Sequence, residues 1–108
     1  ELMFVTINKS EKRFSPTTRY EDYAISDTLF HWQSQSTTSE DSPSGKRYQA
    51  GGARFLLFVR ENPRDAYTYL GPVTYVRHEG SRPMSITWRL QVPMPASLVR
   101  RYATLKSA

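Results

Sequence analysis

The chain is 108 residues long, the length of one domain with a modest core. It carries 15 lysines and arginines against 10 acidic residues, for a formal net charge of +5, and arginine outnumbers lysine by 11 to 4. The lack of cysteine excludes disulfides and thiolate metal sites, and no apolar run approaches the roughly 18 residues that a membrane span requires.

The first third of the chain contains two predicted strands. Residues 2–7 are rich in strand-forming side chains, and residues 29–35 begin with alternating bulky and polar side chains. Between them, residues 8–13 predict a turn and residues 15–18 a loop. Residues 20–29 fit either a short helix or an irregular turn.

The middle of the chain combines a polar segment with the clearest strand. Residues 36–45, rich in Ser and Thr, predict a loop that residues 46–48 close, and Gly51 and Gly52 break the chain again. Residues 54–61 are apolar on both faces, which favours a central strand, and a tight turn follows.

The last third contains two further strands and a helix. Residues 67–78 predict a strand with a bulge or bend at Gly71-Pro72; beyond it, alternation places Val73, Tyr75 and Arg77 on one face. Residues 84–92 alternate cleanly, which predicts a half-buried strand with Trp88 on its apolar side, and residues 96–105 have helical spacing. The fold class is therefore mainly β, with five or six strands and one or two short helices in a small barrel or sandwich.

Residues 30–38 are the most informative segment for function. Trp32 stands beside amides and hydroxyls, and a buried strand rarely carries so many polar groups, because each needs a partner. Such a set is typical of a pocket for a flat polar ligand such as a nucleobase. The alternative, which stays open, is an edge strand with Trp32 packed inward. There is no nucleophile–base pair and no metal-ligand spacing, so we expect neither catalysis nor a cofactor in this domain.

Five segments together resemble one bacterial domain family, long of unknown function, that lies at the C-terminus of large helicase-like proteins. They are FSPTTRYEDY at 14–23, LFHWQSQS at 29–36, FLLFVR at 55–60, YTYLG at 67–71 and HEGSRPM at 78–84. Those proteins often carry a phospholipase-D-like nuclease and resemble modification-dependent (type IV) restriction enzymes. The chain begins at Glu1 without an initiator Met, so we expect residues 1–108 to be one DNA-recognition domain excised from such a parent.

The resemblance implies a curved β-barrel of the SRA or PUA type that binds duplex DNA and flips a 5-methyl- or 5-hydroxymethylcytosine into an aromatic pocket. Its partners would be double-stranded DNA and the nuclease and helicase domains of the same parent chain, in the cytoplasm and without a membrane. Two alternatives remain: a B3-like pseudobarrel that reads sequence in the major groove, and a module that couples the helicase to the nuclease.

The base pocket would need stacking plates, an acceptor for the exocyclic amine of cytosine, and polar groups along the base edge. Asp22 is the expected acceptor, with a solvated turn residue as the alternative. The full set of candidates is Tyr20, Asp22, Tyr23, Trp32, Gln33, Ser34, Gln35, Tyr48 and Tyr69.

Contacts to the DNA backbone would come from side chains in or near loops, where groups at one end of a barrel converge. The candidates are Arg19, Lys46, Arg47, Arg54, Arg77, His78, Ser81 and Arg82.

Overall fold

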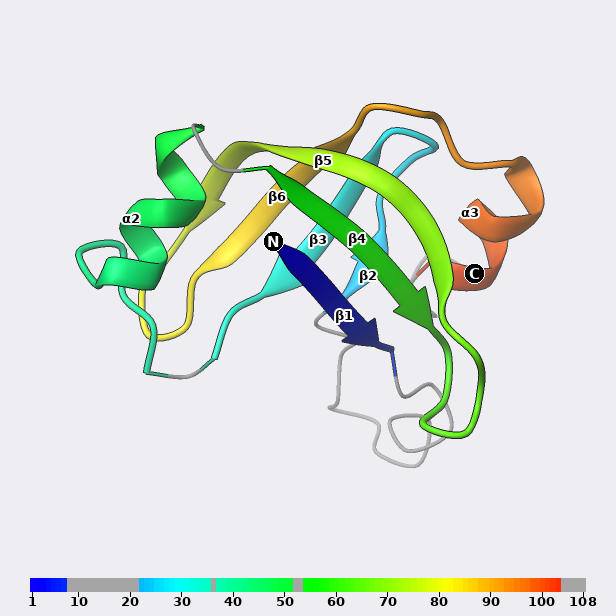
Figure 1. Ribbon diagram of the computed structural model, residues 1–108, viewed down its shortest axis with the longest axis horizontal. Coiled ribbons are helices and arrows are strands. Elements are labelled where there is room, and N and C mark those ends of the chain that lie inside the picture. Colours follow the sequence, from blue (N-terminus) through cyan, green and yellow to red (C-terminus); the bar gives the residue numbers. More distant parts are fainter. Residues whose placement is uncertain (8–21, 36, 52–53, 104–108) are drawn as a thin grey trace.

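The computed structural model describes residues 1–7, 22–35, 37–51 and 54–103. In this part of the chain six strands form one sheet that curls into a half-barrel, and two short helices flank it (Figure 1). The strands are β1 (Leu2–Thr6), β2 (Tyr23–Ala24), β3 (Leu29–Gln33), β4 (Phe55–Arg60), β5 (Thr68–Glu79) and β6 (Ser85–Leu90). The helices are α2 (Pro43–Ala50) and α3 (Ala96–Tyr102).

The sheet has the order β1-β4-β5-β6-β3-β2, so β1 and β2 are its two edges. β1 runs parallel to β4, and every other neighbouring pair is antiparallel. The prediction of a mainly β, curved architecture is confirmed, and the strong apolar run at 54–61 does form an interior strand, β4.

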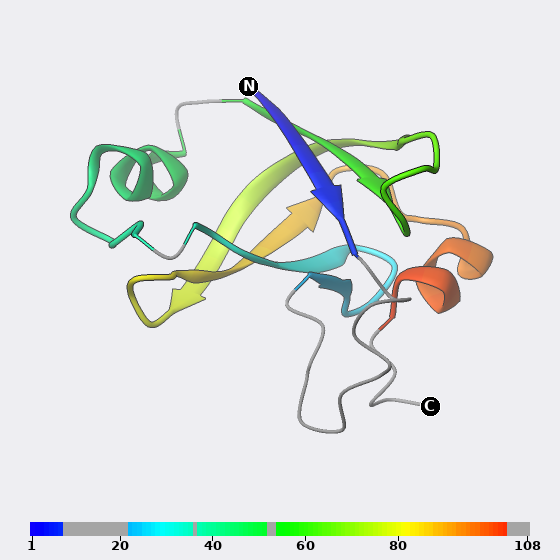
Figure 2. The ribbon, with the colours of Figure 1, turned by 90° about the horizontal axis from the view of Figure 1, so that it is seen from below.

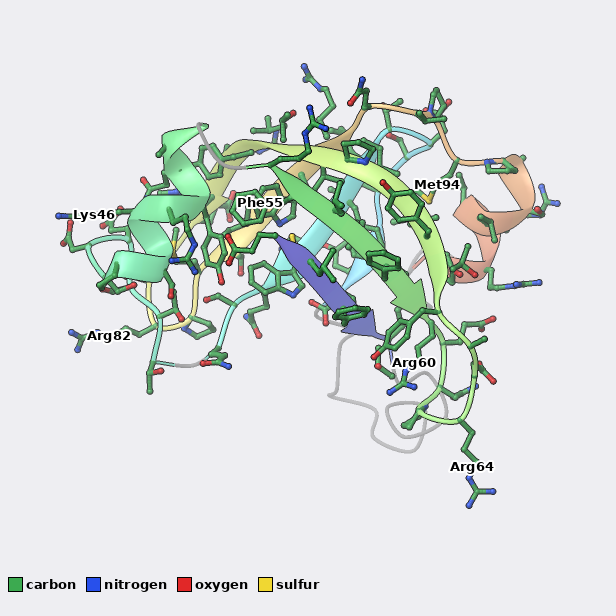
Figure 3. The ribbon with its side chains drawn as sticks, viewed as in Figure 1. Lys46, Phe55, Arg60, Arg64, Arg82 and Met94 are labelled. Atoms are coloured by element: carbon green, nitrogen blue, oxygen red, sulfur yellow. The ribbon has the colours of Figure 1, made fainter. Side chains whose placement is uncertain are left out.

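The core fills the inside of the curl, because alternate side chains of each strand point inward. The predicted apolar side of β6 is confirmed: Ile86, Trp88 and Leu90 are buried, with Trp88 0 % exposed. Thr87, on the other side of the strand, is also buried, so the alternation in burial is less clean than predicted. Phe55 lies toward the α2 end of this core and Met94 toward the α3 end (Figure 3). The remaining buried apolar residues are Met3, Val5, Ile7, Ala24, Phe30, Leu57, Val59, Leu70, Val73, Met84 and Tyr102.

The strand β5 bends at two places, and the second changes which side chains face outward. The predicted bend is confirmed at Gly71, whose φ is 98° and where the pairing with β4 shifts register. A second shift lies between Tyr75, opposite Trp88, and Arg77, opposite Thr87. The extra residue, Val76, reverses the alternation. Our placement of Arg77 on the face of Tyr75 was therefore wrong.

The helix α2 replaces part of the loop predicted at 36–45 and the closing residues 46–48. The Ser42 side chain caps it by accepting a hydrogen bond from the Gly45 N–H (3.0 Å), Pro43 occupies the first turn, and Gly51 ends it with φ 75°. These are standard start and stop signals. The polar composition of the segment concealed them.

The other predicted elements are confirmed where the structure describes them. The strand at 2–7 is β1, that at 29–35 is β3, and the helix at 96–105 is α3 over its described residues. Within 20–29 the described residues form β2 and a bend, so the irregular alternative holds there. Predictions for 8–13 and 15–18, and those for Arg19 and Tyr20, lie outside the described residues.

The two helices lie at opposite ends of the half-barrel (Figures 1 and 2). α2 contacts β5, and α3 contacts β2. Among the described residues, neither helix has the length and apolar character needed to cross a bilayer.

Candidate nucleic-acid interface

The outward face of β5, β6, β3 and β2 carries a row of polar and aromatic side chains in direct register. Tyr23 pairs with His31, His31 with Thr87, and Thr87 with Arg77, so the four positions cross four strands in a line. Two residues from Thr87 on β6, Ser85 lies between Gln33 of β3 and Glu79 of β5. The second bulge in β5 brings Arg77 and Glu79 onto this face.

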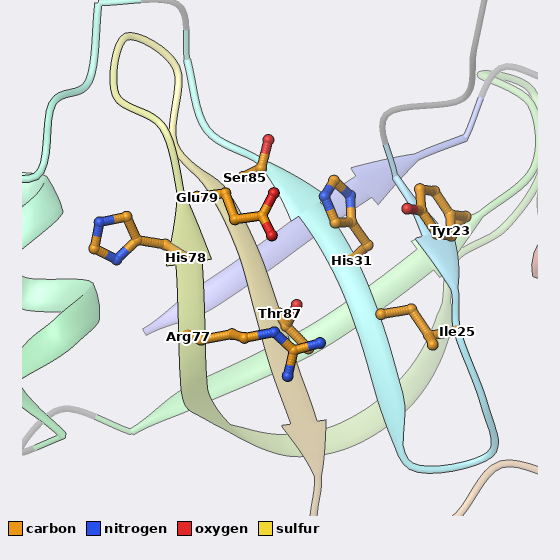
Figure 4. Close-up of a pocket in the computed structure, with 8 residues that line it drawn as sticks. All are labelled: Tyr23, Ile25, His31, Arg77, His78, Glu79, Ser85 and Thr87. Atoms are coloured by element: carbon orange, nitrogen blue, oxygen red, sulfur yellow. The ribbon is translucent and has the colours of Figure 1, made fainter.

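These rows border a partly open hollow of about 200 Å³ (Figure 4). In the close-up, Glu79, Ser85 and His31 lie beside one another on three strands, and β1 and β4, at the far side of the curled sheet, pass behind β6 and β3. The lining residues are Tyr23, Ile25, His31, Arg77, His78, Glu79, Ser85 and Thr87.

The hollow combines a flat aromatic surface with hydrogen-bonding groups of both kinds. The rings of Tyr23 and His31 stack with centroids 4.7 Å apart and planes 13° apart. Arg77 only donates and Glu79, when ionised, only accepts, whereas hydroxyls do both. Within the described part of the chain neither Arg77 nor Glu79 forms an ion pair. Ile25, 44 % exposed, adds an apolar contact.

One border of the hollow is fixed by a chain of hydrogen bonds through His78. Its Nδ1 lies 2.6 Å from the Tyr75 hydroxyl and its Nε2 lies 3.0 Å from Oε2 of Glu40. Both ring nitrogens thus have a protein partner. His78 therefore has a structural role: it connects β5 to the segment before α2.

The turn between β5 and β6 is anchored to the same segment. The Arg82 N–H donates to the Thr38 carbonyl (2.8 Å), and the Glu40 N–H donates to the Ser81 hydroxyl (3.1 Å). Arg82 has φ 58°, and its side chain is exposed. The Ser81 hydroxyl therefore has a structural role. The Arg82 side chain is exposed on the turn between β5 and β6, close in sequence to Glu79.

Trp32 and Tyr48, two of the predicted stacking plates, lie on the inner face of the sheet. Their rings meet edge-on at 5.3 Å, and both contact Trp88. Burial raises the pKa of the Tyr48 phenol, with Arg47 opposing and Glu1 reinforcing the shift. The indole N–H of Trp88 has no hydrogen-bond partner among the described residues. Strand alternation explains the separation: Trp32 faces inward, whereas its neighbour His31 lines the outer hollow.

Four other predicted pocket residues, Asp22, Gln33, Ser34 and Gln35, take part in hydrogen bonds at strand ends. Oδ1 of Asp22 accepts from the Gln33 N–H (2.9 Å). The buried Ser34 hydroxyl accepts from the Met84 N–H (2.8 Å) and donates to the Gln35 carbonyl (3.2 Å). These hydrogen bonds give Asp22 and Ser34 structural roles.

The remaining predicted residues are dispersed. Tyr69 is 52 % exposed and packs against Phe58, away from the hollow. Arg47 pairs with Glu1 at 2.9 Å. Lys46 and Arg54 are exposed, on α2 and just before β4.

Of the predicted site, the structure brings Tyr23, Arg77 and His78 to the hollow, and their binding roles stay predictions. Sequence reasoning missed Ile25, His31, Glu79, Ser85 and Thr87 as lining residues. For Ser85 and Thr87 a signal existed, because they are the polar half of the alternation in β6. Among the described residues, no three His, Asp or Glu side chains gather as a metal site would require.

Comparison with known proteins gives a family. No curated protein matches the chain in sequence. The family described as "Domain of unknown function (DUF3427)" matches residues 1–102, nearly the whole chain, and the chain therefore belongs to the DUF3427 family.

Proposed function

We propose that this domain binds duplex DNA and receives one extrahelical base, a modified cytosine, in the hollow on its outer face. The observation that carries the proposal is the juxtaposition there of a stacked Tyr23–His31 surface with Arg77 and Glu79. The net charge of +5 and the excess of arginine suit a polyanionic ligand.

The size and chemistry of the hollow suit a single base. Pockets for drug-sized ligands measure about 300–1,000 Å³, and this hollow, at about 200 Å³, is smaller. Glu79 would accept from the exocyclic amine of cytosine, and Arg77 would donate to its ring acceptors. Ile25 would contact a substituent at position 5 of the ring.

The energetics permit base extrusion. Unstacking a base costs a few kcal/mol. Stacking on an aromatic ring returns about 1–3 kcal/mol, and a well-placed pair of hydrogen bonds supplies about 1–3 kcal/mol of discrimination. The hollow offers both, so it can offset the cost for one base but not for several.

In this proposal the domain is the target-recognition part of a modification-dependent restriction enzyme and is not itself catalytic. The resemblance in sequence supports that context, with nuclease and helicase domains of the same cytoplasmic parent as partners. The curled sheet is compatible with an SRA- or PUA-like mode of base flipping.

The test is a fluorescence-anisotropy titration of the domain against three matched duplexes, one unmodified, one with 5-methylcytosine and one with 5-hydroxymethylcytosine. We expect a preference for a modified duplex. Glu79→Gln should weaken that complex about tenfold, because the neutral amide oxygen accepts a weaker hydrogen bond from the cytosine amine than the carboxylate does. Ile25→Ala should narrow the preference for 5-methylcytosine by a few-fold, about the value of one buried methyl group.

Asp41→Asn is the matched control, because it removes the same charge at an exposed position that does not line the hollow. Equal binding of all three duplexes by the unaltered domain would contradict base reading and favour sequence readout in the groove. No binding at any salt concentration would contradict DNA recognition and favour a coupling module.

A further inference from the structure

A second exposed surface, on the outer side of β1, β4 and the start of β5, is unusually aromatic. Phe4 stacks on Phe58 (5.0 Å, 25°), and Phe58 packs against Tyr69 (4.8 Å, 33°). Tyr67 meets Phe4 edge-on at 5.1 Å. We call these four residues the aromatic strip. Phe4 and Tyr69, at the two ends of the row, are 55 % and 52 % exposed.

A fixed cation borders the aromatic strip. The Arg60 guanidinium lies 4.3 Å from the centre of the Tyr67 ring, and its Nε donates to the Thr6 hydroxyl at 2.9 Å. Arg64 extends from the turn at the same end of β4 (Figure 3), and Arg54 precedes the other end.

The carboxylates around the aromatic strip are already engaged. Glu1 pairs with Arg47 at 2.9 Å, and Glu61 pairs with Arg101 at 3.3 Å. Asp65 accepts from the Asn62 N–H within its own turn. In the described part of the chain Arg54 and Arg64 form no ion pair, so the surface around the rings is electropositive.

We propose that the aromatic strip is a binding surface for single-stranded DNA, separate from the hollow. Exposed rings on a sheet accept unstacked bases, and flanking arginines accept phosphates, which is the combination that single-strand-binding surfaces use. The outer faces of Phe4 and Tyr69 are the stacking positions. A strand lying along β4 would meet Arg54 at one end and Arg60 with Arg64 at the other.

The charge pattern favours this ligand over a protein partner. An apolar protein surface would gain from the rings but would have to desolvate Arg60, and unpaired buried charges are costly. A nucleic acid satisfies both, because its bases are flat and its backbone is anionic. Because the sheet curls, β1 and β4 lie behind β6 and β3 as seen from the hollow, so the two surfaces are different sites.

The probe is a fluorescein-labelled oligothymidine of about 12 nucleotides, within the roughly 4–16 that single-strand-binding folds cover. The decisive variants are Phe4→Leu, which keeps apolar area but removes the ring, and Phe4→Trp, which keeps a ring. We expect Phe4→Leu to weaken binding about 5- to 100-fold and Phe4→Trp to retain it. Tyr69→Phe should bind normally and Tyr69→Leu weakly.

Further measurements separate this proposal from the hollow and from misfolding. Glu79→Gln should bind the oligothymidine as the unaltered domain does, and Phe4→Leu should keep any preference among duplexes. Val92→Ala, at a 60 % exposed apolar position elsewhere, should change nothing. Thermal melting by circular dichroism checks each fold. Binding retained by Phe4→Leu, or absent from the unaltered domain at low salt, overturns the proposal. Self-association that Phe4→Leu abolishes would instead assign the aromatic strip to a protein contact.

Discussion

At the residue scale, Tyr48 shows how a side chain inside the aromatic interior responds to its surroundings. Its ring touches Trp32, Phe55 and Trp88, and burial is the main reason why its pKa lies above the ordinary value of 10.0. A buried phenolate is poorly solvated, so the folded state favours the protonated form. Ionisation of Tyr48 therefore opposes folding.

The sign of the resulting pH dependence follows from linkage. The contribution of Tyr48 to stability is fully present below its unfolded pKa, near 10.0, and is lost as the pH rises through the higher folded pKa. We expect Tyr48→Phe to lose less stability than the unaltered domain above that pH. Urea unfolding across the alkaline range measures this. Parallel stability curves for the two proteins would show that the phenol ionises without penalty.

At the element scale, α2 provides a case in which intrinsic propensity and packing predict opposite signs. Replacing a helical Gly by Ala ordinarily stabilises by about 0.5–1 kcal/mol. At Gly45, however, an added Cβ would overlap the carbonyl of Ser39, which is backbone and cannot move aside cheaply. We expect Gly45→Ala to destabilise the domain by about 1–3 kcal/mol, the usual cost of overpacking.

Urea unfolding of Gly45→Ala, beside Lys46→Ala at the next and exposed position, tests this. The Lys46 variant should be nearly neutral. A stabilised Gly45→Ala would mean that the segment before α2 yields easily and does not hold the helix in place.

The sequence predicted the secondary-structure elements better than the side of the sheet on which each side chain lies, and β5 shows why. The strand, its bend at Gly71 and the neighbouring alternation in β6 depend on local chemistry, and all three were recognised. The bulge at Val76 depends on how β5 fits β6, so no local pattern marked it. That bulge turns Arg77 and Glu79 outward, so the hollow could not be predicted from the sequence. Tyr23 and Arg77 were predicted as site residues, but not as neighbours in one hollow.

The error at α2 had a different origin. Ser42, Pro43 and Gly51 were all visible as helix boundary signals, but the polar residues between them carry no apolar periodicity. A short helix that buries little beyond Gly45 and part of Tyr48 leaves such a weak pattern.

At the scale of the whole molecule, the excess of positive charge should make the proposed duplex binding sensitive to salt. Each phosphate neutralised by Lys or Arg adds about 0.9 to the slope of log K against log salt. We expect Arg82→Ala to lower the slope by about that amount for every duplex while leaving the preference for a modified base unchanged. Arg100→Ala, on α3 at the opposite end, is the control. A slope unchanged by Arg82→Ala would place the duplex away from the turn that carries it.

The parallel pairing of β1 with β4 also affects the order in which the strands join the sheet during folding. Leu2 pairs with Leu56, and Phe30 pairs with Trp88. The strands at both sides of the sheet, β1 and the β2–β3 hairpin, therefore pair with strands that are distant along the chain. Among the strands of the described residues, only the β4–β5–β6 meander and the β2–β3 hairpin pair sequence neighbours. Closing long loops before contacts form slows folding, and topologies of this kind fold in about milliseconds to seconds. We therefore expect the meander to form first, with the N-terminal strand, and with it the Phe4 ring, added last.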